Sequence, residues 1–280
     1  MYPVLFDFGS IEVFGRTFPL VIGTWGVIVL IGVLCGWLIA LYLGPKYYPQ
    51  IPWTDVYFMA IIWGVVGGKL LNVMIHWPKF LDGRLSFSEL MFSGGTWLGG
   101  LIAGIAWGVA VAIYYKVDYG LWANMWFVGI PLAHGIGRLA CLFAGCCFGK
   151  ECSWPWGITY TSEIAHQRMG TPLHVPLHPT PIYESGLQMV NFAICFWMFK
   201  RNAPGWSVMA AFFGLYGTER FFIEFFRADA MRGQFGIFST SQWISLGMVA
   251  ISIVMAVWII RRERRIRSDE PKQEPSATAS

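Results

Sequence analysis

Several charged residues lie in a stretch that is otherwise apolar enough to enter a lipid bilayer. The stretch is Trp206–Asp229, and it carries Glu219, Arg220, Glu224 and Arg227. A charge at membrane depth is costly unless it is paired, so such charges usually belong to functional sites. Arg220, Glu224 and Arg227 are spaced i, i+4 and i+7, which places them on one helical face. The face indicates a site for an anion, with an ion pair that only joins two helices as the alternative.

A further arginine lies in a second apolar stretch, LAHGIGRLACLFAGCCFGKEC, at residues 132–152. Arg138 stays protonated, and its planar guanidinium can hold a phosphate through two parallel hydrogen bonds. His134 precedes it by one helical turn, where an imidazole could act as a base or orient a partner. Together with Arg220 and Arg227, Arg138 could neutralise a phosphodiester. The residue types therefore indicate a site for a phosphate ester.

The composition is that of an integral membrane protein. Hydrophobic residues make up 56% of the 280 residues and charged residues 13%, far from the mix of a soluble domain. Most of its apolar runs are long enough to cross about 30 Å of hydrocarbon. The runs lie at residues 20–43, 55–75, 96–115, 121–142, 182–199, 206–226 and 237–260. The sequence thus predicts an all-α membrane protein with about seven transmembrane helices and a small extracytoplasmic loop or head region.

Basic residues after the last apolar run predict the orientation. Five arginines between Arg261 and Arg267 belong in the cytoplasm by the positive-inside rule, so an odd number of spans puts the N-terminus outside. No cleavable signal peptide is evident. The net charge of +4, mostly in the tail, favours anionic lipid headgroups over nucleic acid. We expect an extracytoplasmic segment at 1–19, a membrane domain at 20–260 with extracytoplasmic loops at 76–93 and 143–180, and a cytoplasmic, basic and disordered tail at 261–280.

The predicted topology brings the polar segments to one depth. His134 and Arg138 lie near the outer end of one helix, and Arg220 and Glu224 near the outer end of another. Three inward-running helices begin at the same level, with Trp25, Gly94–Gly100 and Tyr183–Glu184. Scattered structural ion pairs would not share a depth, whereas a site acting on a lipid headgroup would. A transporter would instead place its charges at several depths along a pathway.

Several blocks of the sequence also occur, in the same order, in one known family. The blocks are Gly137–Arg138 with Gly145 and Gly149, His178–Glu184 (HPTPIYE), Arg220–Asp229 (RFFIEFFRAD), Gly94–Gly95 with Gly99–Gly100, Gly26, and Ser241–Trp243. They run from about residue 20 to 260, and in them the chain resembles the prolipoprotein diacylglyceryl transferase family. The resemblance implies a seven-helix enzyme of the bacterial inner membrane. Such an enzyme moves the diacylglyceryl group of phosphatidylglycerol onto the lipobox cysteine thiol of a prolipoprotein, forming a thioether and releasing glycerol phosphate.

The resemblance also implies roles for individual residues. Arg138, Arg220 and Glu224 carry over as catalytic residues, and His134 is our own further candidate. The expected substrate-binding residues are Arg138, Arg220, Arg227, Tyr183, Gly99, Gly100, Trp25, Cys141 and Cys146. The expected partners are phosphatidylglycerol, prolipoprotein signal peptides and membrane lipids, without a cofactor. The chemistry agrees, because a thiol must become a thiolate to attack carbon and the departing phosphate needs fixed positive charge.

The chain departs from the family pattern at four places. Many members have a histidine before Gly99–Gly100, where this chain has Leu98. Trp25 stands where the family has a tyrosine, Cys141 where it has an asparagine and Cys146 where it has an acidic residue, although some branches carry these cysteines. Without the histidine, thiol activation falls to His134, to Glu224 or to local positive charge alone. A lipid- or lipoprotein-binding relative that kept the fold and lost the reaction is the alternative function.

Four cysteines cluster near one end of a predicted span, at Cys141, Cys146, Cys147 and Cys152. Their spacing lacks the C-x2-C pairs typical of zinc and iron–sulfur sites and of thiol–disulfide enzymes. Disulfides among them are possible in an oxidising compartment, and their pairing cannot be read from sequence. His174 and His178 are four residues apart, but the proline between them argues against a shared helical face. The sequence therefore predicts no metal site.

Overall fold

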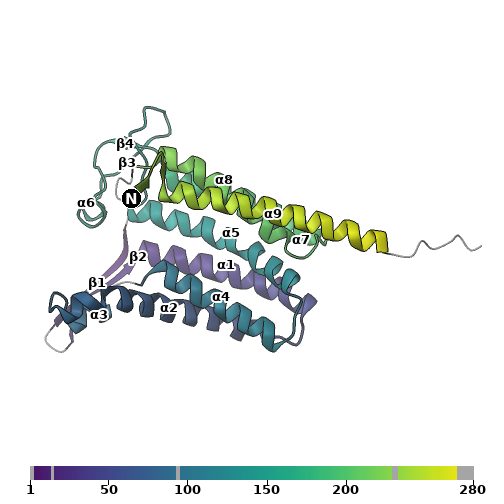
Figure 1. The fold of residues 1–280 in the computed structure, drawn as a ribbon. Coiled ribbons are helices and arrows are strands. Elements are labelled where there is room, and N and C mark those ends of the chain that lie inside the picture. Colours follow the sequence, from purple (N-terminus) through teal and green to yellow (C-terminus); the bar gives the residue numbers. More distant parts are fainter. Residues whose placement is uncertain (1–2, 14–15, 93–94, 229–232, 270–280) are drawn as a thin grey trace, which may run out of the picture. The chain divides into compact units, whose positions relative to one another are not determined.

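The computed structural model describes residues 3–13, 16–92, 95–228 and 233–269 of the chain. Long helices make up most of this part (Figure 1). They are α1 (Thr24–Tyr47), α2 (Trp53–Leu81), α4 (Trp97–Tyr114), α5 (Tyr119–Ala144), α7 (Thr180–Lys200), α8 (Ser207–Ile223) and α9 (Thr240–Asp269). Each of the seven predicted apolar runs overlaps one of these helices.

The helices have the surface of a membrane protein. Within the described residues, α1, α2, α5 and α9 are long and apolar enough to cross a bilayer, and Leu98–Tyr114 of α4 is a shorter apolar helix. Large apolar side chains are exposed along them, including Val65 at 69% and Val254 at 68%. Contiguous apolar surface of this kind suits lipid and not water. The chain is a helical, multi-pass membrane protein, and the count of seven spans stays a prediction.

Three small antiparallel sheets add to the helices in the described residues, and the sequence analysis did not predict them. A hairpin of β1 (Val4–Val13) and β2 (Arg16–Gly23) fills most of the expected N-terminal segment. The other pairs are β3 (Ile158–Thr159) with β4 (Pro176–Leu177) and β5 (Gln234–Phe235) with β6 (Phe238–Ser239). Phe6 and Phe8, two residues apart in β1, gave the signal for a strand, because aromatic residues favour extended backbone. The first helix consequently begins at Thr24 and not at residue 20.

The last helix runs past the expected end of the membrane domain. α9 continues to Asp269, so residues 261–269 are helical and are not part of a disordered tail. The physical reason is that this stretch, RRERRIRSD, is rich in arginine, which is a good helix former, so charge alone does not end the helix. Residues 270–280 lie outside the described part of the chain.

The chain divides into two compact units, where the sequence suggested one membrane domain. One unit comprises Met1–Gly36 and Trp126–Ser280, and the other comprises Trp37–Met125. In the smaller unit, α2 and α4 pack closely through glycines, and the Thr96 N–H donates to the Gly68 carbonyl at 3.0 Å. The same unit contains α3 (Phe87–Phe92), whose Leu90 carbonyl accepts a hydrogen bond from Lys69 Nζ at 2.8 Å.

In the larger unit, α8 packs against both α7 and α9. The loop between α5 and α7 carries β3, α6 (Glu163–Met169) and β4. The Lys150 N–H donates to the carbonyl of Phe226, shortly after α8, at 2.8 Å and so joins this loop to the segment that follows α8. Within the loop, the Gly149 N–H donates to the His178 carbonyl at 2.9 Å. A Cβ at Gly149 would overlap His178 and the Phe226 carbonyl. The glycine therefore allows the close approach of the segments that carry the polar residues described next.

Candidate active site

Three arginines and two glutamates form an ionic cluster inside the larger unit. They come from α5 (Arg138), α7 (Glu184), α8 (Arg220), the short 3-10 helix η1 at Glu224–Phe226 (Glu224), and the residue after η1 (Arg227). Glu184 is 1% exposed, Arg227 5% and Arg220 8%. Three guanidinium groups against two carboxylates leave one positive charge in excess, which an anionic ligand would neutralise.

Glu184 lies at the centre of the cluster and contacts all three arginines. Its Oε1 accepts a hydrogen bond from Arg227 Nη1 at 2.8 Å and lies 3.6 Å from Arg220 Nη1. Its Oε2 lies 2.5 Å from Arg138 Nε. The sequence analysis placed Glu184 in a family block but not among the site residues. The missed signal is that Glu184 is the single acidic residue of α7, in the first turns of a helix with few charges.

Glu224 forms a second ion pair with Arg220. Its Oε2 accepts a hydrogen bond from Arg220 Nη2 at 2.8 Å, and its Oε1 accepts one from Ser239 Oγ at 2.8 Å. Ser241 Oγ, in the first turn of α9, lies 3.4 Å from Arg220 Nη2. Arg220 and Glu224 therefore form an ion pair, as their i, i+4 spacing indicated. The two serines were outside the predicted set, because nothing in the sequence shows that α9 begins beside the end of α8.

His134 is part of the cluster through Arg138. Its Nε2 accepts a hydrogen bond from Arg138 Nε at 3.0 Å, so the neutral ring carries its proton on Nδ1. The ring also stacks edge-on against Tyr216, with 5.3 Å between the ring centroids. The lone pair that a general base would use is therefore already engaged by an arginine.

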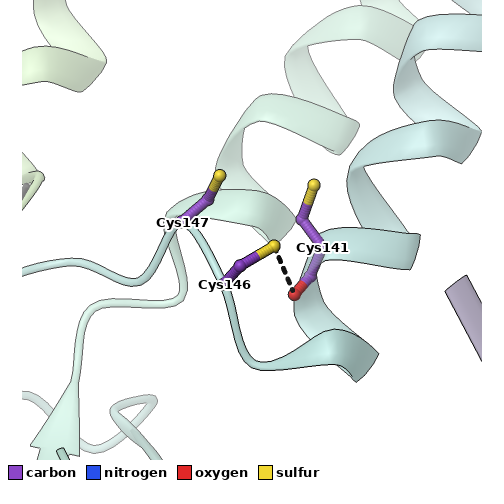
Figure 2. Close-up of side chains that lie close together, drawn as sticks. All are labelled: Cys141, Cys146 and Cys147. Atoms are coloured by element: carbon purple, nitrogen blue, oxygen red, sulfur yellow. Dashed lines mark hydrogen bonds between the residues drawn. The ribbon is translucent and has the colours of Figure 1, made fainter. Parts of the chain in front are cut away.

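Three thiols lie beside the arginines, at the end of α5. The Sγ atoms of Cys141, Cys146 and Cys147 all lie within 4.8 Å of one another (Figure 2). Arg138 Nη1 is 3.9 Å from Cys147 Sγ. Hydrogen bonds from the other two thiols, aided by the charge of Arg227, lower the pKa of Cys147. All six cysteines of the chain are free thiols in the structure.

An apolar groove of about 660 Å³ runs along α7 and α8. Tyr183 and Leu187 line it from α7, Phe222 from α8, and Trp154 and Trp156 from the long loop. Tyr183 Oη accepts a hydrogen bond from Trp156 Nε1 at 2.9 Å. Tyr183 therefore belongs to the wall of this groove, where its ring and hydroxyl contact Trp156, His178 and Phe226.

One buried acid interrupts the apolar wall of the groove. Glu219 of α8 lines it and accepts hydrogen bonds from Gln188 Nε2 at 2.5 Å and Asn191 Nδ2 at 2.9 Å. The sequence analysis noted Glu219 as an intramembrane charge without giving it a role. Its amide partners on α7 satisfy the carboxylate, which is what a buried acid requires.

The remaining predicted residues lie elsewhere in the described structure. Trp25 is 52% exposed in the first turn of α1. Gly99 and Gly100 belong to the smaller unit, where a Cβ at Gly100 would come within 2.9 Å of the Gly64 carbonyl and one at Gly99 would overlap Gly67. Their observed contacts are therefore those of close helix packing. Gly94 and Asp229, quoted from the family blocks, lie outside the described residues.

The fold and the cluster together define a class of protein. It is a multi-pass helical membrane protein with a buried, cationic site beside an apolar groove, suited to an anionic ligand with an apolar part. The sequence matches the family model of prolipoprotein diacylglyceryl transferase over residues 12–258. The chain belongs to this family.

Curated relatives match along most of their length. A phosphatidylglycerol–prolipoprotein diacylglyceryl transferase 2 of Clostridium perfringens is 31% identical over 87% of this chain and 93% of the relative. The corresponding transferase of Vibrio atlanticus is 30% identical over 93% of this chain and 91% of the relative. One from Clostridium tetani is 28% identical over 90% of this chain and 96% of the relative. The relatives are bacterial proteins. The family model, which matches residues 12–258, includes every segment that builds the cluster.

Proposed function

We propose that this chain transfers the diacylglyceryl group of phosphatidylglycerol to the lipobox cysteine of a prolipoprotein, forming a thioether and releasing glycerol phosphate. Membership of the family and the names of the relatives support the reaction. The observation that carries it in the structure is the buried cluster of three arginines around Glu184. Its excess positive charge fits the phosphate of one substrate and of one product.

The chemical step explains why the excess charge matters. The thiolate sulfur attacks a glyceryl carbon, the bond from that carbon to the phosphate oxygen breaks, and the electron pair leaves with the phosphate. The phosphodiester becomes a monoester, so negative charge grows on the leaving group as the bond breaks. Arg138 and Arg220 stabilise that growing charge more than they stabilise the bound lipid, which is how fixed charges accelerate a reaction. Glu184 keeps the arginines in place.

Glu224 is the group that accepts the thiol proton. Its Oε1 accepts a hydrogen bond from the Ser239 hydroxyl, which supports a role in accepting a proton from a donor such as a thiol. Its side chain is 10% exposed against 1% for Glu184. His134 is less suited, because Arg138 donates to its Nε2. The positive charge of the cluster also lowers the pKa of an incoming thiol, which reduces the work that a base must do.

The apolar groove holds the acyl part of the lipid. Its walls are aromatic and aliphatic, and its volume of about 660 Å³ lies in the range of ligand pockets. The loop tryptophans, Trp154 and Trp156, cover one side. Trp25, Cys141 and Cys146 complete the proposed substrate-binding residues, on the strength of the family pattern, whereas the contacts of Gly99 and Gly100 are those of helix packing. The prolipoprotein approaches with its signal peptide in the membrane.

The protein crosses the bacterial cytoplasmic membrane seven times, with the N-terminus outside and the C-terminus inside. Two observations support this topology. Each predicted span coincides with a long helix, and the arginines at 261–267 are at the end of α9, where the positive-inside rule places the cytoplasm. Fusion of a reporter active only in the cytoplasm to each terminus would test it.

A lipid-binding relative without transfer is the second candidate. Leu98, where many members have a histidine, favours it, and this side chain is 53% exposed in the structure. The two functions differ in turnover and not in phosphatidylglycerol binding. A folded, lipid-binding wild type that makes no thioether product would select the second candidate.

Transfer of labelled diacylglyceryl from phosphatidylglycerol to a lipobox peptide by the purified protein tests the proposal. We expect the wild type to form the thioether and both Arg138→Ala and Arg220→Ala to lose it. Arg84→Ala is the matched control, because the Arg84 side chain is 75% exposed, and it should keep full activity. Equal activity in all three variants would exclude the arginine cluster as the site.

A further inference from the structure

The three thiols at the end of α5 have the geometry of a metal site. Their sulfur atoms lie within 4.8 Å of one another, and Figure 2 shows them gathered around the turn that follows the helix. Thiolates bound to one ion at about 2.3 Å are about 3.8–4.0 Å apart, whether the ion is tetrahedral or trigonal. The observed separation therefore needs only small side-chain adjustments to become a coordination sphere.

The turn that ends α5 brings the cysteines close together although they lack C-x2-C spacing. The Cys146 N–H donates to the Cys141 carbonyl at 3.0 Å, and the Gly145 N–H donates to the Leu142 carbonyl at 3.2 Å. Gly145 adopts a φ of 75°. These are the two hydrogen bonds and the left-handed residue of a Schellman motif, which folds the chain back onto the last helical turn. Cys146 is thereby brought beside Cys141, although four residues separate them.

The third thiol is held in place by its own backbone. Cys147 has a φ of 59°, in the left-handed region that costs energy for a residue with a side chain and persists only where neighbours support it. Its carbonyl accepts a hydrogen bond from Thr180 Oγ1 at 2.5 Å. This conformation follows the Schellman turn directly, and the Cys147 sulfur lies within 4.8 Å of the other two. The site is therefore preformed by the fold and requires no rearrangement of the chain.

The surrounding charge favours an anionic complex at this position. Three thiolates and a divalent ion carry three negative charges against two positive ones, so the complex has a net charge of −1. Arg138 Nη1 lies 3.9 Å from Cys147 Sγ, and Arg227 contributes positive charge at the same thiol. A bare cation would be repelled here, whereas a thiolate-bound metal would be stabilised.

We propose that Cys141, Cys146 and Cys147 bind one thiophilic metal ion, of the class of Zn²⁺ or Cu⁺. Soft thiolate ligands select these ions over Mg²⁺ or Ca²⁺. In the described part of the chain the group holds three ligand atoms, which suits three-coordinate Cu⁺ or a Zn²⁺ that takes an outside fourth ligand. The inference goes beyond the proposed transferase and replaces the expectation, drawn from spacing alone, that the chain has no metal site.

Cadmium titration of the full-length protein tests this site without reference to turnover. The protein is purified in detergent with a non-thiol reductant, freed of metal with a chelator and titrated with Cd²⁺. The growth of cadmium–thiolate absorption in the ultraviolet is followed, and Zn²⁺ is used as a competitor. We expect saturation at one Cd²⁺ per chain and release of Cd²⁺ by Zn²⁺. Absence of a saturable band in the fully reduced wild type would overturn the proposal.

Serine variants identify the ligands. Cys141→Ser, Cys146→Ser and Cys147→Ser should each weaken Cd²⁺ binding by more than about 100-fold, since loss of a mere outer-shell partner already costs about 10–100-fold. Cys35→Ser is the matched control, a half-buried thiol in α1, and should bind as the wild type does. Unchanged binding in the three cluster variants would overturn the proposal.

Protection from alkylation gives the same answer without any variant. The wild type is treated with N-ethylmaleimide with and without one equivalent of Cd²⁺, and the labelled peptides are counted by mass spectrometry. Cd²⁺ should protect Cys141, Cys146 and Cys147 together and leave labelling of Cys35 unchanged. A disulfide within the cluster that resists the reductant, so that no thiols are available to protect, would assign the cluster to disulfide formation and overturn the metal site.

Discussion

The two units of this protein contain family motifs of opposite physical character. In the larger unit, the motifs around Arg138, Glu184 and Arg220 place charges from three helices into one buried cluster. In the smaller unit, the motif at Gly99–Gly100 allows direct backbone contact between α4 and α2. A family motif can therefore mark either chemistry or packing, and the residue type tells which. Charges need partners when they are buried, whereas glycines remove volume.

The largest effect on stability and transfer is expected from a substitution of Glu184, the central carboxylate of the cluster in the larger unit. Glu184→Gln leaves three buried guanidinium groups around a neutral amide, and breaking a buried ion pair from one side costs about 3–5 kcal/mol. We expect a large loss of thermal stability in detergent together with loss of transfer. Glu12→Gln is the control, on the exposed N-terminal hairpin. A Glu184→Gln protein as stable and as active as the wild type would show that the cluster does not depend on its central carboxylate.

Arg138→Lys separates charge from geometry in the same cluster. Lysine keeps the positive charge but loses the planar guanidinium. It also lacks the Nε atom of Arg138, which lies 2.5 Å from Glu184 Oε2 and 3.0 Å from His134 Nε2. Since a lost donor to a developing oxyanion costs about 10²–10³ in rate, we expect a fall of this order in kcat. KM for phosphatidylglycerol should change much less. A mainly raised KM would instead assign Arg138 to ground-state binding.

Gly99→Ala makes the corresponding change in the smaller unit. A Cβ at Gly99 overlaps the Gly67 backbone and Leu71, and overpacking of this kind costs about 1–3 kcal/mol. We expect a lower melting temperature with little change in transfer per folded molecule. Gly104→Ala is the matched control in the same helix, because a Cβ there meets nothing within 4 Å. If Gly99→Ala lost transfer while keeping its melting temperature, Gly99 would be a substrate contact and the contrast between the units would fail.

The sequence predicted the helices and the charged residues of the cluster better than the segments that connect them. Each long apolar run became a helix, and Arg220 with Glu224 paired through their i, i+4 spacing. Glu184 was underestimated because its partners lie in other helices, and only tertiary structure brings Arg138 and Arg227 to it. The β1–β2 hairpin was not predicted, because apolar runs of helical length do not reveal short strands. The thiol cluster depends on a left-handed Gly145, which the residue spacing does not reveal.

Substitution of His134 should have the smallest effect on transfer, and it distinguishes His134 from Glu224 as the base. It lies inside the cluster, but its Nε2 accepts a hydrogen bond from Arg138, so its contribution is to position the guanidinium. Glutamine can offer an acceptor at a similar place. His134→Gln should therefore lower transfer by less than about tenfold, well below the ~10²–10⁴ that loss of a general base costs. Glu224→Gln should instead lower transfer by about 10²–10⁴, the loss expected when a general base is removed.

His166→Gln serves as the control for this last experiment. His166 is exposed on α6, and its Nδ1 contacts only the Thr171 carbonyl among the contacts that the structure describes for that ring. Its substitution should leave the rate of transfer unchanged. If His134→Gln instead lowered transfer by about 10²–10⁴ and Glu224→Gln did not, the proton of the thiol would go to the histidine. The hydrogen bond from Arg138 would then have to break during each turnover. The cluster would rearrange during the reaction and would not act as a preorganised site.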